Sequence, residues 1–288
     1  MRFARPVDVV LRSCFVVVVV AAVVGGAVGC VHTAPLPEAS TLTSAGIATR
    51  LSTSSARRQR LDGVIKAALP GLQGAVLSAT VDVAAEAPRQ LSIAVRSFFE
   101  VPTQVFVADN DTVTLYDASS GAPRFSRGTA TDKSLQRVLG VPLVPDDVVA
   151  LILGRAPVDV VSGRPAPRVK VIAIDEDAGT YTASIERAGR GTLWWTARFA
   201  DDSLVALTAF AGDGRRLVEA RCSDHRVVDG VAFAWAVRLR LIPEREGGAF
   251  AESKEVVLTV QQATFNGPPL PPEAFVLEPP PGTPIGAL

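Results

Sequence analysis

Apolar and polar side chains alternate with a period of two along most of the chain beyond residue 60. The clearest example is the stretch 231–241, "VAFAWAVRLRL", in which large apolar residues take every second position and alanine or arginine stands between them. Successive side chains of a β-strand point to opposite faces of a sheet. The pattern therefore predicts a strand with one large apolar face and one small or charged face.

The same alternation recurs in short stretches that are separated by turn-forming residues. It is clear in "GTYTASIER" at 179–187, "GTLWWTARFADD" at 191–202 and "KEVVLTVQQATF" at 254–265. Glycine-containing turns such as "AGDG" at 211–214 and "VVDG" at 227–230 lie between such stretches. Strands joined by tight turns form antiparallel hairpins. The sequence thus predicts a mainly β protein, with about a dozen strands in one curved antiparallel sheet that is apolar on one face.

Two stretches have helical rather than strand spacing, at 132–140 and 144–154. Each ends at a glycine, a residue that commonly follows the last helical position. The second begins with Pro145 and two aspartates, which suit the first turn of a helix. Its apolar residues occur almost all round the helix, so other elements must cover it on several sides. We expect it to pack across the concave side of the sheet.

The N-terminal segment has a basic head and then the apolar run "CFVVVVVAAVVGGAVGC" at 14–30. A run of this length is near the lower limit of ~17–25 residues for a membrane-spanning helix, and its small final residues suit a processing site better. Its last four residues, Ala27–Cys30, resemble a bacterial lipobox, with alanine where that motif usually has leucine. We predict a lipoprotein signal peptide over residues 1–29 and acylation of Cys30. An unacylated cleaved signal peptide and a single-pass N-terminal anchor are the alternatives.

The segment that follows is rich in proline, serine, threonine and alanine. This composition predicts a flexible tether over residues 30–60, followed by one β-domain over residues 61–288. The tether ends in the basic cluster Arg57–Arg60. We interpret this cluster as a solvated surface patch, with contact to anionic lipid head groups as the alternative.

Charge and cysteine usage narrow the possible functions. Lys+Arg and Asp+Glu number 29 each, so there is no electrostatic case for a nucleic-acid partner. The chain has three cysteines, and removal of the signal peptide would leave Cys222 as the one unmodified thiol, without an internal disulfide. Cys222 falls on an apolar strand face and is predicted to be a small core residue.

Catalytic and metal-binding residues are scarce. The two histidines are too few, with one thiol, to build a usual zinc site, and no cofactor motif is present. The stretch "CSDH" at 222–225 gathers a nucleophile, an acid and a base, but neighbouring strand residues point to opposite faces. We interpret it as a strand running into a polar turn, and we predict that the protein is not an enzyme. A hydrolase that uses His225 is the alternative.

The middle of the chain, residues 116–154, resembles the LolB-like outer-membrane lipoproteins and their LolA relatives. The resemblance consists of a strand ending in "LYD", a hairpin, a helix closing on Leu-Gly, the link "GVPL" and a second helix ending in "ILG". It implies an incomplete β-barrel that is closed on its concave side by helices and contains an apolar cavity for acyl chains. Burying alkyl chain contributes ~0.8 kcal/mol per CH2, so such a cavity needs no charged anchor. The predicted cavity-lining residues are Leu139, Val148, Leu151, Ile152, Trp195, Phe199, Phe233 and Trp235, with solid core packing as the alternative for each.

The resemblance also implies a protruding loop that contacts the membrane. Here the stretch "RSFFEVPTQ" at 96–104 links two strands, and Phe98, Phe99 and Val101 would form the apolar tip. Glu100 falls about where the family has the apolar tip residue, which departs from the pattern. Folding of the two phenylalanines under the barrel is the alternative.

Together these observations predict a monomeric, lipid-anchored protein on the periplasmic face of the outer membrane. Its partner would be a lipid or an acylated lipoprotein, and it would assist insertion of lipoproteins into that membrane. The alternative is a structural or regulatory envelope protein that uses the same barrel to bind a protein partner.

Overall fold

The computed structural model describes residues 42–70, 76–97, 101–119, 123–131, 133–135, 143–158, 165–242 and 254–288. The strands of this part of the chain are β1 (Arg60–Pro70), β2 (Val76–Glu86), β3 (Gln90–Arg96), β4 (Pro102–Asp109), β5 (Thr112–Asp117), β6 (Arg124–Thr129), β7 (Arg168–Asp175), β8 (Thr180–Arg187), β9 (Gly191–Arg198), β10 (Leu204–Phe210), β11 (Arg216–Val228), β12 (Val231–Leu241), β13 (Lys254–Phe265) and β14 (Ile285–Ala287). The helices are α2 (Ser44–Ala56), α4 (Pro145–Ile152) and the short 3-10 helix η3 (Pro272–Phe275).

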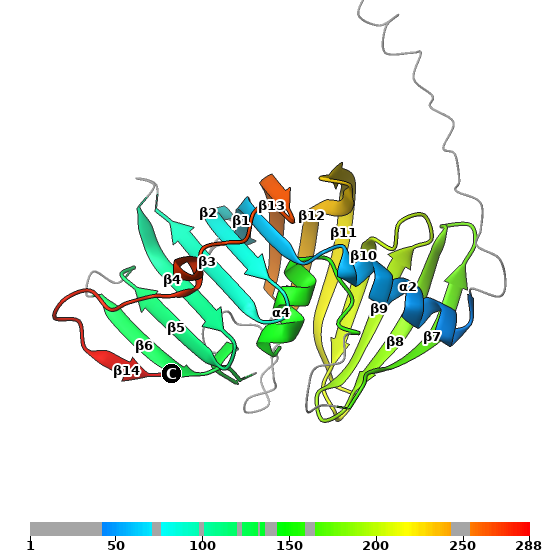
Figure 1. Ribbon diagram of the computed structural model, residues 1–288, viewed down its shortest axis with the longest axis horizontal. Coiled ribbons are helices and arrows are strands. Elements are labelled where there is room, and N and C mark those ends of the chain that lie inside the picture. The colour runs from blue at the N-terminus through cyan, green and yellow to red at the C-terminus, as the bar shows by residue number, and fades with distance from the viewer. Residues whose placement is uncertain are drawn as a thin grey trace, which may run out of the picture. The chain divides into compact units, whose positions relative to one another are not determined.

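All fourteen of these strands belong to one sheet, in the order β14-β6-β5-β4-β3-β2-β1-β13-β12-β11-β10-β9-β8-β7 (Figure 1). Neighbouring strands are antiparallel, except that β14 runs parallel to β6. The order consists of two meanders, β1 to β6 and β7 to β13, which are joined where β1 pairs with β13. Because β1 and β13 pair in the middle, the two meanders form one continuous apolar face.

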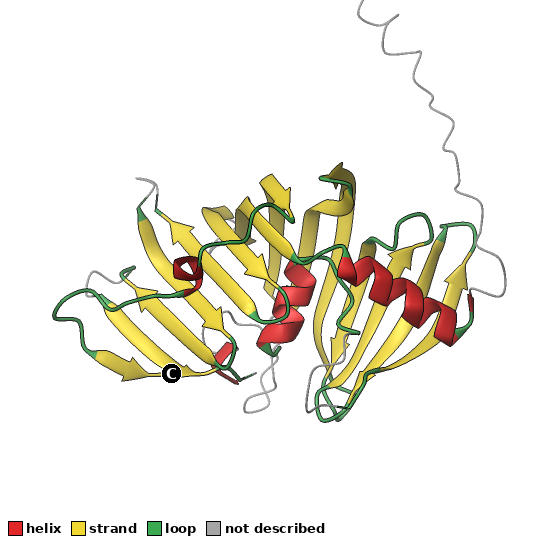
Figure 2. Ribbon diagram, viewed as in Figure 1, coloured by secondary structure: helices red, strands yellow, loops and turns green. Residues whose placement is uncertain are grey.

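The predicted fold class is confirmed: the protein is mainly β, with one large curved sheet and few helices (Figure 2). The predicted alternation is also seen along β9, where Leu193, Trp195 and Ala197 are buried and Trp194 is exposed. The strand count is slightly higher than the predicted dozen, in part because the three residues of β14 add an edge strand.

Helix α2 lies within residues 30–60, where the sequence suggested only a flexible tether. It begins after Thr43, whose hydroxyl accepts a hydrogen bond from the N–H of Gly46 at 3.1 Å. Ile47 and Leu51, one helical turn apart, are buried in the same core as the apolar face of the sheet. In Figure 1 the helix crosses the strands of the second meander. Only two large apolar residues in this Ser/Thr-rich stretch have helical spacing, so its composition resembles that of a flexible linker.

Helix α4 forms as predicted and ends just before Gly154. The backbone of Gly154 has a φ of 62°, and the N–H of Arg155 returns to the carbonyl of Ala150 at 2.9 Å, which closes the last turn. Of the other predicted helix, over 132–140, the described residues 133–135 are helical and the rest lie outside the described residues. No helix in the described part of the chain combines the length and the hydropathy needed to cross a bilayer.

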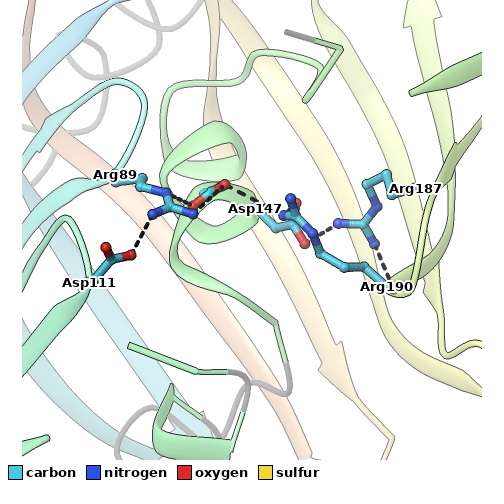
Figure 3. Close-up of polar contacts among 6 residues, drawn as sticks. Arg89, Asp111, Asp147, Arg187 and Arg190 are labelled. Atoms are coloured by element: carbon cyan, nitrogen blue, oxygen red, sulfur yellow. Dashed lines mark hydrogen bonds and ion pairs between the residues drawn. The ribbon is translucent and has the colours of Figure 1, made fainter. Parts of the chain in front are cut away.

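Ion pairs hold the N-terminal end of α4 between the two meanders (Figure 3). On one side, Asp146 pairs with Arg89 of the β2–β3 turn at 2.7 Å. On the other side, Asp147 pairs with Arg187 at the end of β8, and Arg190 of the following turn lies 3.5 Å from Asp146. The side chains of Asp147 and Arg187 are almost fully buried, at 3% and 5% exposure. The pair therefore fixes the helix over the apolar face, because Arg187 would be buried without a carboxylate partner if Asp147 moved away.

We predict that Asp147→Ala lowers the free energy of unfolding by about 3 kcal/mol, since it leaves the Arg187 guanidinium buried without its carboxylate. The measurement is urea unfolding of the purified protein. Asp111→Ala is the matched control: Asp111 pairs with Arg89, but its side chain is 83% exposed, so the loss should stay below about 1 kcal/mol. Adding Arg187→Met to Asp147→Ala should recover part of the loss. Equal effects of Asp147→Ala and Asp111→Ala would contradict this role of the buried pair.

Candidate functional site

An apolar cavity of about 380 Å³ lies between α4 and the apolar face of the sheet. Strands from both meanders contribute to its wall, on either side of the β1–β13 pairing. Representative lining residues are Ile65, Val83, Ile93, Val218, Leu239 and Leu258. Ligand pockets of proteins typically have volumes of ~300–1,000 Å³ and mostly apolar walls, so this cavity has the dimensions of a binding site.

Part of the wall follows from the alternation in the sequence, although Ala232 and Ala234, which stand between the large apolar residues of β12, also line the cavity. In β12 the residues Phe233, Val237 and Leu239 line the cavity, whereas the intervening Arg238 and Arg240 are exposed on the opposite face. Across the cavity, α4 contributes Val148, Leu151 and Ile152. These three positions are spaced by three and four residues, so they share one face of the helix.

The structure brings together four of the residues that the sequence predicted around a cavity: Val148, Leu151, Ile152 and Phe233. Three others lie elsewhere in the fold. Trp195 is buried in β9, and Phe199 packs against the ring of Tyr181 with the ring centres 5.3 Å apart. The ring of Trp235 is covered by the guanidinium of Arg226, 4.7 Å from its centre. Of the remaining predicted residues, Leu139, Phe98, Phe99 and Cys30 lie outside the described residues, and Val101, just before β4, is exposed.

Cys222, expected to be a core residue, lines the cavity from β11. Burial raises the pKa of its thiol to about 12, because the apolar surroundings disfavour the thiolate. Asp224 is exposed and pairs with Arg226, and the Nε2 atom of His225 lies 2.8 Å from the carbonyl oxygen of Leu204. The nucleophile, acid and base of the "CSDH" stretch therefore do not converge on one site. The described residues also contain no group of three or more metal-ligating side chains.

Arg58 is the one charged residue among the described residues that line the cavity. The interpretation of Arg57–Arg60 as a solvated patch is wrong for this residue, which is only 3% exposed. Its guanidinium donates hydrogen bonds to the carbonyls of Gly154, just after α4, and of Ala232 in β12. No local sequence pattern indicates this burial, because these partners lie 96 and 174 residues further along the chain. Burial lowers the pKa of Arg58, and the charges of Asp201 and Asp202 partly oppose that shift.

Comparison with protein-family models found no match, and no curated protein matches the sequence. Solved structures with the same fold exist. A LolA superfamily protein from Nitrosomonas europaea has a TM-score of 0.55 and 12% identity, and the match covers 82% of this chain and 98% of that one. A DUF1329 family protein from Desulfovibrio piger also has a TM-score of 0.55 and 12% identity, with 80% and 94% coverage.

A third similar structure is a domain described as an outer membrane lipoprotein-sorting protein, from Vibrio parahaemolyticus. Its TM-score is 0.55 at 9% identity, with 79% of this chain and 94% of that chain covered. At such low identity the likeness concerns the fold alone. It confirms the LolA-like incomplete barrel that the sequence predicted.

Proposed function

We propose that this protein binds an acyl chain, from a lipid or from an acylated lipoprotein, in the cavity beneath α4. The observation that carries the proposal is the cavity itself: a hollow of about 380 Å³ with an almost wholly apolar wall, covered by a helix that ion pairs hold in place. Water molecules find few hydrogen-bonding partners at such a wall, whereas each buried methylene of a ligand contributes ~0.8 kcal/mol to the binding free energy. An apolar chain is therefore the ligand that the cavity favours.

The fold supports the same ligand class. One protein with this fold is described as an outer membrane lipoprotein-sorting protein domain, and the acyl chains of lipoproteins belong to the ligand class that the cavity favours. We further propose that residues 1–29 are a lipoprotein signal peptide, that acylated Cys30 anchors the protein, and that the β-domain faces the periplasm from the outer membrane. The proposed membrane-contact loop would present Phe98, Phe99 and Val101 to the bilayer. Val101, which is among the residues that the structure describes, is exposed.

A cavity-filling substitution tests the acyl-binding proposal. Leu151→Trp on α4 would place an indole ring, larger than the leucine side chain, in the cavity and exclude about two methylenes of the ligand. At ~0.8 kcal/mol per methylene this corresponds to an affinity about fifteenfold lower. The measurement is displacement of a fluorescent fatty-acid probe, together with mass spectrometry of the lipid that co-purifies with the full-length protein.

The matched control is Ile174→Trp, because Ile174 is 40% exposed on β7 and does not line the cavity. It should leave both the affinity and the co-purified lipid unchanged. Wild-type protein that binds no probe and carries no lipid would contradict the proposal. A stable protein neighbour in envelope crosslinking, without lipid, would then favour the alternative role in binding a protein partner.

Cys222 provides an independent test, because its thiol lines the cavity and its pKa is raised to about 12. In a variant with Cys14→Ser and Cys30→Ser, Cys222 is the one remaining thiol. Only the thiolate reacts, so at pH 8 a charged disulfide reagent should label Cys222 more than about a hundredfold more slowly than it labels a free cysteine. The rate should continue to rise between pH 8 and pH 10, where an ordinary thiol levels off.

A bound fatty acid should slow the labelling of Cys222 further, because it would occupy the same cavity. Labelling of the urea-unfolded protein is the control and should be fast in both cases. A rate that fatty acid leaves unchanged would show that the ligand binds elsewhere.

A further inference from the structure

A second, polar pocket of about 480 Å³ adjoins the apolar cavity. Helix α2, the β9–β10 turn and the β11–β12 turn form its wall. Arg58 and Ala232 line this pocket and also line the apolar cavity. Arg58 therefore borders both hollows.

The charge of Arg58 is poorly compensated. Both of its side-chain hydrogen bonds go to uncharged backbone carbonyls, those of Gly154 and Ala232. Within the described part of the chain it forms no ion pair, although it is only 3% exposed. Burying a cation without an anion is unfavourable, so this position favours a negatively charged group nearby.

The carboxylates of the polar pocket are already engaged by other groups. Asp202 accepts hydrogen bonds from Arg50 at 2.8 Å and from the hydroxyl of Tyr181 at 2.9 Å. Asp201 accepts hydrogen bonds from the N–H and the hydroxyl of Ser203, at 3.0 and 2.6 Å, and lies 3.6 Å from Arg198. Neither carboxylate therefore neutralises Arg58 by direct contact.

The pocket offers further groups that suit an anion. Arg57 lines it and is exposed, and its side chain forms no ion pair with a described residue. Thr53 and Ser54 line it from the same end of α2 and add hydroxyl donors. Guanidinium groups bind carboxylate and phosphate oxygens in forked pairs of hydrogen bonds, and hydroxyls complete such sites.

We propose that this pocket binds the anionic head group, a carboxylate or a phosphate, of the amphiphile whose acyl chain occupies the cavity. The inference rests on the proposed function, since it assigns the head of the same ligand. Arg58, which borders both hollows, contacts the head from the side of the cavity, and Arg57 contacts it from the solvent side. The favoured ligand is thus an anionic amphiphile rather than a neutral one.

The test compares ligands that share one chain and differ in the head. Hexadecanoate, hexadecyl phosphate and hexadecanol compete at pH 8 with a neutral fluorescent acyl probe on the full-length protein. We expect at least tenfold tighter binding of the two anions than of the alcohol. Comparison of the carboxylate with the phosphate identifies which anion the pocket prefers.

Substitutions locate the preference in the pocket. Arg57→Gln should reduce the ratio of anion to alcohol affinity severalfold, and Arg58→Gln should bring it close to one. Arg58→Lys keeps the charge and should keep part of the preference. Arg221→Gln is the matched control, because Arg221 is an exposed arginine of β11 that lines neither hollow, and it should change no affinity.

The outcomes separate this inference from the proposed function. If all three ligands bind wild-type protein equally well, the head-group site is refuted and acyl binding stands. If none binds, the proposed function itself fails. A preference that survives both Arg57→Gln and Arg58→Gln would place the anion elsewhere and overturn the inference. Should Arg58→Gln fail to fold, the wild-type ratio and the exposed Arg57→Gln variant still decide.

Discussion

The buried ion pair between Asp147 and Arg187 determines where α4 lies, and the cavity exists because of that position. A curved sheet that is apolar on one face must cover that face. Here α2 and the core of the second meander cover one part, and α4 spans the region beside the β1–β13 pairing. A helix held at its N-terminal end by charges from both meanders need not sink fully into the sheet. The apolar hollow beneath it is the result.

The cavity beneath α4 and the pocket beside α2 differ in the groups that line them. The cavity has an apolar wall, and burial of apolar area is not directional. The pocket beside α2 has arginines and hydroxyls, which form directional hydrogen bonds. Arg58 belongs to both, and it also links the end of α4 to β12. Arg58 therefore links three segments that are distant in the sequence: the end of α2, the end of α4 and strand β12.

Local features of this fold could be predicted from the sequence, and features that depend on distant partners could not. The period of two placed Phe233 and Trp195 on apolar strand faces, and Pro145 and Gly154 marked the ends of α4. Alternation cannot tell a cavity wall from solid core, because that depends on what lies opposite: α4 faces Phe233, whereas Trp195 packs within the core. Arg58 is buried by partners about a hundred residues or more away, which no local pattern contains.

The pairing of β1 with β13 has a consequence for folding. Leu61 pairs with Phe265, so the central seam of the sheet joins segments from almost opposite ends of the domain. Each meander can form from neighbouring hairpins soon after its own residues are synthesised, but the seam must wait for the last long strand. Closing so large a loop is slow, because the chain loses entropy before the contact repays it. Until then β1 and β12 both present unpaired edges, and the newly made chain is most prone to aggregate during that interval.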